Sequence, residues 1–78
     1  SKWATLYIAA GKKDKINKVD IVGLLYKKGE LQKEEIGLIE VFDHMSYVAI
    51  QRKKINHLIR VLKDEKIKGR KYKLGIDE

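Results

Sequence analysis

The chain has 78 residues, 18 lysine and arginine against 11 aspartate and glutamate side chains, a formal net charge of +7, and neither cysteine nor proline. This length allows one domain, residues 1–78, with a core near the lower limit of independent stability. Disulfides, cysteine-ligated metals and a transmembrane helix of roughly 18 apolar residues are excluded, so we expect a cytoplasmic domain with a polyanionic partner and no membrane contact.

The first predicted element is a β-strand over residues 3–10 (WATLYIAA). Leu6 and Ile8 fall on one face of this strand, and Tyr7 falls on the other. A loop follows, and it carries the first group of basic residues: Lys12, Lys13, Lys15 and Lys18.

The second predicted element is a helix. Asn17 has the character of an N-cap, and Asp20 stands three positions later as the acidic half of a capping box. The apolar spacing continues to Lys28, and Gly29 is well placed to end the helix. Gly23 costs about 1 kcal/mol relative to alanine inside a helix, so we expect the helix to approach the sheet closely there.

The middle of the chain predicts a β-hairpin. Residues 31–35 suggest a short helical turn, and residues 36–42 (IGLIEVF) and 45–51 predict two strands close enough to pair antiparallel. This segment is rich in acidic residues, unlike the rest of the chain.

The last third predicts a second helix and a final strand. From Arg52 onward, apolar residues recur at helical spacing, and residues 67–74 then read as a strand interrupted by Gly69. Residues 52–73 also hold ten basic side chains against two acidic ones. The element order βαββαβ is that of the ferredoxin-like α+β fold, a four-stranded antiparallel sheet with two helices on one face.

Catalytic residues are not predicted. His44 and His57 are thirteen residues apart in different elements, with no cysteine to complete a zinc site. No glycine-rich phosphate loop is present, and the paired carboxylates fall at helix ends and tails. We therefore expect no enzyme activity, no metal and no cofactor.

Binding is better supported, because one face of such a sheet has no helix to cover it. Two tyrosines flanked by lysines on an open sheet suit RNA, whose bases stack on aromatic rings while ammonium groups meet the phosphates. The alternative is that Tyr7 and Tyr47 form a cross-strand pair that only stabilises the sheet, by a few tenths of a kcal/mol to about 1 kcal/mol. The residues expected on the open face are Thr5, Tyr7, Met45, Tyr47, Ala49, Lys71 and Lys73.

These positions resemble those of an RNA recognition motif. Leu6-Tyr7-Ile8 is similar to the first-strand pattern of that motif. On the third strand, Tyr47 and Val48 match the motif's consensus, whereas residues 43–45 depart from it and replace a basic residue, a glycine and an aromatic residue. Met45 then offers a softer apolar surface in place of an aromatic ring.

A narrower resemblance covers nearly the whole chain, from about Thr5 to Leu74. Four sequence segments resemble, in order and spacing, those of the C-terminal RNA-binding domain of DEAD-box RNA helicases of the DbpA type, in its Bacillus-type branch. The segments are LYIAAGKKDKI, DIVGLL, IGLIEVFDHMSYVAI and IKGRKYK. This resemblance implies a divergent, RRM-like domain that anchors its helicase core to a hairpin of the large-subunit (23S) ribosomal RNA during ribosome assembly. The domain itself would bind RNA and hydrolyse nothing.

The resemblance and the basic groups together predict the site. We expect a monomer, with RNA contacts from the open face, the first loop and the last strand. A protein-interaction or dimerisation module on the same fold remains the alternative. The predicted RNA-binding residues are Tyr7, Lys12, Lys13, Lys15, Met45, Tyr47, Arg70, Lys71 and Lys73.

Overall fold

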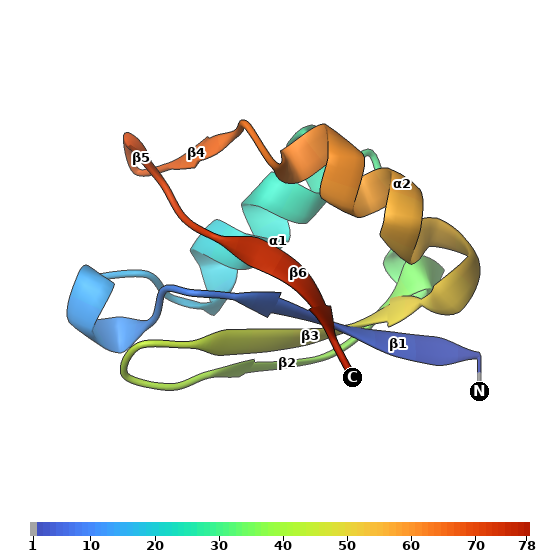
Figure 1. The fold of residues 1–78 in the computed structure, drawn as a ribbon, viewed down its shortest axis with the longest axis horizontal. Helices are drawn as coiled ribbons and strands as arrows, with labels where there is room; N and C mark the ends of the chain where they lie inside the picture. The colour runs from blue at the N-terminus through green and yellow to red at the C-terminus, as the bar shows by residue number, and fades with distance from the viewer. Residues whose placement is uncertain (1) are drawn as a thin grey trace.

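The computed structural model describes residues 2–78, which form a layer of strands covered on one face by two helices (Figure 1). The elements in chain order are β1 (Trp3–Ile8), the 3-10 helix η1 (Lys12–Asp14), α1 (Lys18–Lys27), the 3-10 helix η2 (Lys33–Glu35), β2 (Ile36–Val41), β3 (Ser46–Gln51), α2 (Arg52–Leu62), β4 (Lys66–Ile67), β5 (Arg70–Lys71) and β6 (Leu74–Asp77). The main sheet has the order β2-β3-β1-β6, and all its pairs are antiparallel. The predicted α+β fold is confirmed and is consistent with a ferredoxin-like arrangement.

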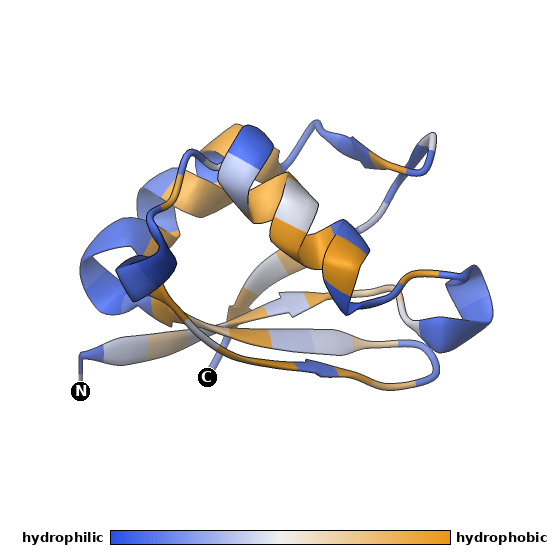
Figure 2. Cartoon of the chain, turned by 180° about the vertical axis from the view of Figure 1, so that it is seen from behind, coloured by the Kyte–Doolittle hydropathy of each residue, from blue (hydrophilic) through white to orange (hydrophobic). Residues whose placement is uncertain are grey.

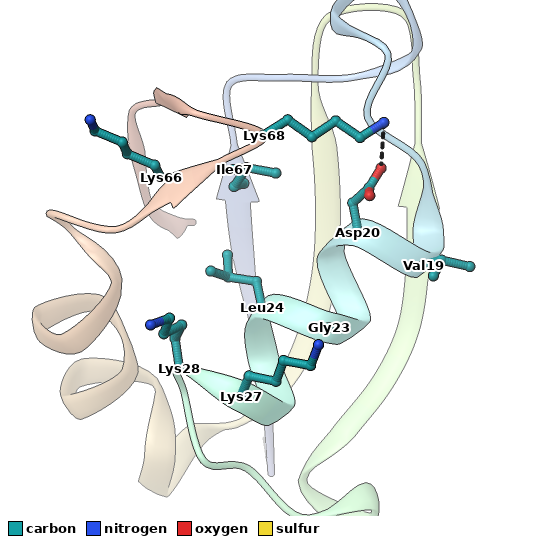
Figure 3. Close-up of a pocket in the computed structure, with 9 residues that line it drawn as sticks. All are labelled: Val19, Asp20, Gly23, Leu24, Lys27, Lys28, Lys66, Ile67 and Lys68. Atoms are coloured by element: carbon teal, nitrogen blue, oxygen red, sulfur yellow. Dashed lines mark ion pairs between the residues drawn. The ribbon is translucent and has the colours of Figure 1, made fainter.

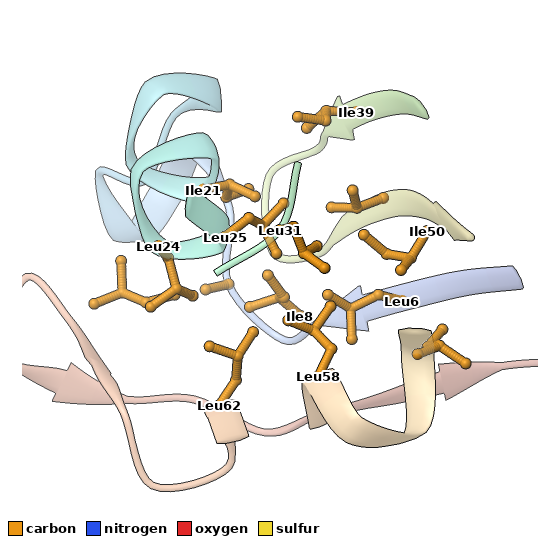
Figure 4. Close-up of a cluster of buried hydrophobic side chains, with 14 of the residues drawn as sticks. Leu6, Ile8, Ile21, Leu24, Leu25, Leu31, Ile39, Ile50, Leu58 and Leu62 are labelled. Carbon is orange, nitrogen blue, oxygen red and sulfur yellow. The ribbon is translucent and has the colours of Figure 1, made fainter. Parts of the chain in front are cut away.

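The core lies between the sheet and the two helices (Figure 4). Alternate residues of the central strands point into it, and Leu6 on β1 pairs with Val48 on β3. Leu25 of α1 and Leu58 of α2 close the other side, and all four side chains are buried. Burial of such apolar area is the main stabilising term of the fold.

The start of α1 confirms the predicted capping box. The Asn17 side chain accepts a hydrogen bond from the Asp20 N–H (3.1 Å), and the Asp20 carboxylate accepts one from the Asn17 N–H (2.9 Å). Two backbone N–H groups that the helix leaves unpaired are thereby satisfied.

Two glycines near α1 have different surroundings. A Cβ at Gly29 would lie 2.6 Å from Leu58 Cδ1 and 2.7 Å from the Leu25 carbonyl oxygen, so glycine is needed where α1 ends against α2. The close approach expected at Gly23 is wrong. A Cβ there would meet nothing within 4 Å outside the backbone of its own helix. Gly23 faces open space because the face of α1 that packs on the sheet is formed by other residues, including Ile21 and Leu25.

Helix α2 turns its apolar stripe to the core and its polar side chains to solvent. Ile55, Leu58 and Leu62 are buried, whereas Lys53 and Arg60 are exposed. Among residues 2–78, neither helix combines the length and the apolar character that crossing a bilayer requires.

The predicted strand over residues 67–74 is wrong. The chain instead forms a short hairpin, β4–β5, and the fourth strand of the main sheet is β6. Lys68 and Gly69 make the turn with φ of 50° and 81°, and two consecutive positive φ values are typical of the two-residue turns that reverse a chain within a hairpin. The alternation resumes at Leu74 and Ile76, which pack against the core beside β1.

Candidate nucleic-acid interface

The face of the sheet that the helices leave uncovered carries the predicted tyrosine pair. Tyr7 on β1 lies directly opposite Tyr47 on β3, and both side chains are partly exposed. The same row continues to Glu40 on β2 and Gly75 on β6. The two predicted aromatic positions therefore share one row across the middle of the sheet.

A third aromatic residue, Phe42, was missed by sequence reasoning. Its ring lies 5.9 Å from that of Tyr47, centroid to centroid, in an edge-to-face arrangement, and its side chain is half exposed. The available signal was its place directly after Val41, which packs on the core, because successive strand residues point to opposite faces. The ring of Tyr7 leans the other way and lies against Gly75, where a Cβ would come within 3.0 Å of it.

Met45 lies in the turn before β3. Its carbonyl oxygen accepts a hydrogen bond from the Phe42 N–H (2.8 Å), which closes the connection between β2 and β3. The side chain is partly buried. Met45 thus lies at the edge of the aromatic row, and its backbone is paired with that of Phe42.

The open face contains acidic residues and no basic ones among the described strands. We define the open face as the outward-facing residues of the main sheet: Trp3, Thr5, Tyr7, Gly37, Leu38, Glu40, Tyr47, Ala49, Gln51, Gly75 and Asp77. The prediction that Lys71 lies on this face is wrong, because the hairpin replaces the predicted last strand and Lys71 belongs to β5. Lys73 directly precedes β6 and continues its pairing with β1, since the Ala9 N–H donates to the Lys73 carbonyl oxygen. Positive charge near the open face therefore comes from residues outside its strands.

The first basic group lies on η1, at the end of the sheet beside Phe42. The N–H groups of Lys12 and Lys13 donate to the carbonyl oxygens of Phe42 (2.8 Å) and Asp43 (2.9 Å), so the loop is fixed against the turn between β2 and β3. Lys12, Lys13 and Lys15 are all exposed. The backbone is held while the ammonium groups remain in solvent.

The second basic group, on and after the β4–β5 hairpin, lies at the same end of the molecule as the first: Lys68, Arg70, Lys71 and Lys73. The ammonium of Lys68, at the tip of the hairpin, donates to the Lys15 carbonyl oxygen (2.6 Å), although 53 residues separate the two in sequence. The Ala9 N–H also donates to the Lys73 carbonyl oxygen (2.8 Å). Figures 1 and 2 show η1 and the hairpin at one end of the long axis. We call this surface the basic end: Lys12, Lys13, Lys15, Lys68, Arg70, Lys71 and Lys73.

The carboxylates near the basic end compensate it only in part. Lys71 lies 3.4 Å from Asp64, and Lys68 lies 3.4 Å from Asp20. Exposed pairs of this kind contribute about 1 kcal/mol at most, so they leave the ammonium groups available to an anionic ligand. A clear pKa shift falls elsewhere: the backbone N–H of Gln32 lowers the pKa of Glu35 by hydrogen bonding to its carboxylate.

The structure brings no metal-binding cluster together within residues 2–78. His44 lies in the turn between β2 and β3, and His57 lies on the exposed side of α2. The described residues instead form the basic end, which lies beside a row of aromatic rings.

Comparison with known proteins agrees with this arrangement. A family model described as the DbpA RNA binding domain matches residues 5–75. A relative named ATP-dependent RNA helicase DbpA, from Bacillus subtilis (strain 168), is 39% identical over 70 residues, which cover 90% of this chain. The match spans only 15% of that relative's length.

Proposed function

Because the chain belongs to the family of DbpA RNA-binding domains, and is therefore a non-catalytic RNA-binding domain, we propose that it anchors a helicase to ribosomal RNA. The helicase would be an ATP-dependent DEAD-box enzyme whose core lies elsewhere in a longer protein. Its target would be a hairpin of the large-subunit (23S) ribosomal RNA, bound in the cytoplasm during ribosome assembly. The domain would work as a monomer formed by residues 1–78.

The observation that carries this proposal is the meeting of η1 and the hairpin beside an aromatic row. Lys15 and Lys68 join two basic segments at one end, and Phe42 stands next to η1 at the edge of the open face. Folded RNA presents both phosphates and unpaired loop bases, and this pairing of cations with rings suits both. The contacts proposed at the basic end are those of Lys12, Lys13, Lys15, Arg70, Lys71 and Lys73. The contacts proposed on and beside the aromatic row are those of Tyr7, Met45 and Tyr47.

The test is a binding assay of the chain against a 23S ribosomal RNA hairpin and an unrelated hairpin of equal length, each at two salt concentrations. Specific anchoring requires tighter binding of the ribosomal hairpin at both. Affinity should also fall with salt, with a log–log slope of roughly 0.7 to 0.9 for each phosphate contact. Equal affinity for the two hairpins would reduce the proposal to nonspecific electrostatics.

The basic end predicts the effect of two substitutions. Arg70→Ala and Lys71→Ala should each weaken binding of the ribosomal hairpin and lower the salt slope by about one unit, because each removes one phosphate contact from an exposed side chain. Circular dichroism should show an unchanged fold. Lys33→Ala is the matched control, since Lys33 is also exposed but lies in η2, away from the basic end. Unchanged affinity in both variants would contradict the assignment.

A protein-interaction or dimerisation role is the second candidate, and the open face favours it. Leu38 is 69% exposed there, and Trp3 is 39% exposed. Sedimentation of the chain with and without Leu38→Ser separates the two functions. A dimer that dissociates in the variant would support the second candidate, and a monomer in both would exclude dimerisation.

A further inference from the structure

A second lysine-lined surface lies on the helix side of the domain, between α1 and the β4–β5 hairpin (Figure 3). It is an open groove with a volume of about 380 Å³. We call it the hairpin groove, and its lining residues are Val19, Asp20, Gly23, Leu24, Lys27, Lys28, Lys66, Ile67 and Lys68. It shares only Lys68 with the basic end.

The hairpin groove has more cations than the protein itself compensates. Four ammonium groups line it against the single carboxylate of Asp20. Lys68 pairs with Asp20 at 3.4 Å, and Lys28 lies 4.0 Å from Glu65. Among residues 2–78, Lys27 and Lys66 have no carboxylate partner. Positive charges gathered on the low-dielectric walls of a groove raise the local concentration of anions.

Gly23 lies in the wall that α1 contributes, and nothing in the fold requires a glycine there. A Cβ at this position would point into open space, whereas the helix would be more stable with almost any other residue. Val19, Gly23 and Lys27 follow one another at i, i+4 spacing, so they form one strip of α1 along the groove. The missing side chain leaves bare backbone beside the Lys27 ammonium, which lets a ligand approach closely.

We propose that the hairpin groove binds the sugar–phosphate backbone of the same RNA, as a second contact that rests on the proposed function. The groove and the basic end are continuous, because Lys68 lines the groove and its ammonium also donates to the Lys15 carbonyl oxygen. A polyanion that lies along η1 is thereby led past the hairpin tip and along α1. RNA is favoured over an acidic peptide because the neighbouring basic end already belongs to an RNA-binding domain.

Charge removal is the first arm of the test, with the 78-residue chain and a ribosomal RNA hairpin that includes several base pairs of flanking duplex. The double variant Lys27→Gln and Lys66→Gln should lower the salt slope by roughly 0.7 to 0.9 for each lysine removed. Between about 50 and 200 mM salt, its relative loss of affinity should then be about ninefold smaller than in the unmodified chain. Lys33→Gln is the matched control and should leave the slope unchanged.

Filling the groove is the second arm. Gly23→Gln and Gly23→Glu add side chains of equal length, and neither should lower the melting temperature, because both residues favour helix over glycine. Both variants should bind RNA more weakly than the unmodified chain. Gly23→Glu should lose about fivefold more affinity than Gly23→Gln, since its carboxylate would face the phosphate.

The outcomes separate this inference from the proposed function. If Arg70→Ala weakens binding but the groove variants match Lys33→Gln, the basic end binds RNA and the inference is overturned. If the unmodified chain does not distinguish the ribosomal hairpin from an unrelated one, the proposed specific anchoring is wrong, whatever the groove variants show. A reduced slope in the double variant, together with weaker binding at unchanged stability in Gly23→Glu, supports the hairpin groove.

Discussion

At the scale of single residues, the two glycines near α1 differ in the space around them. Gly29 is buried, and its neighbours on two sides leave no room for a methyl group. Gly23 has space for a side chain and lies within the helix, where glycine is conformationally costly. The first glycine serves packing, whereas the second leaves helix backbone open to the hairpin groove.

The contrast predicts opposite effects of one substitution. Gly23→Ala should raise the free energy of unfolding by up to about 1 kcal/mol, which corresponds to roughly 4–8 °C in melting temperature for a chain of this size. Gly29→Ala should lower it by about 1–3 kcal/mol, because the Leu25 carbonyl oxygen is backbone and cannot move aside. Thermal unfolding followed by circular dichroism measures both. A destabilised Gly23→Ala variant would indicate a packing role that the structure does not contain.

At the scale of elements, what could be predicted depended on how local the signal was. The limits of α1 follow from the Asn17 and Asp20 cap and from Gly29, all within the helix or next to it. The last strand was misplaced because residues 67–74 keep a strand-like alternation through a reversal of the chain. Only the pairing of β6 with β1, which joins the two ends of the sequence, decides where the fourth strand lies.

The turn of the β4–β5 hairpin makes a prediction about that element. Gly69→Val should disorder the hairpin, because a β-branched residue at φ of 81° is strained by at least 1–2 kcal/mol. RNA affinity should fall while the melting temperature falls only modestly, since Ile67 is the one buried residue among the four residues of the two hairpin strands. Gly69→Asn, which tolerates positive φ, is the control. Amide hydrogen exchange at Arg70 and Lys71 reports the hairpin directly, and continued protection in Gly69→Val would refute the account.

At the scale of the whole molecule, the cations and the aromatic rings occupy different surfaces. The open face has carboxylates at Glu40 and Asp77, and the basic end lies beyond its edge. The residue types of both surfaces could be predicted from the sequence. Their arrangement could not, because the contact between Lys15 and Lys68 depends on the complete fold.

This separation predicts two kinds of binding defect. Tyr7→Leu and Tyr47→Leu should each weaken binding of the ribosomal hairpin by about 1–3 kcal/mol if a base stacks on the ring, with the salt slope unchanged because no charge is lost. Arg70→Ala should change the slope instead. Titrations at several salt concentrations distinguish the two. Full affinity in both tyrosine variants would return the tyrosines to a purely structural role in the sheet.

The direction of β1 sets where the domain holds its ligand relative to what precedes it. β1 starts at Trp3 near one end of a molecule 31 Å long and runs toward η1 at the other end (Figure 1). Any segment joined before Trp3 in a longer protein would therefore leave from the pole opposite the basic end. RNA bound at the basic end would be kept about one domain length away from a partner attached through that segment. The domain would thus act as a spacer, and a partner attached there would reach RNA about one domain length from the bound segment.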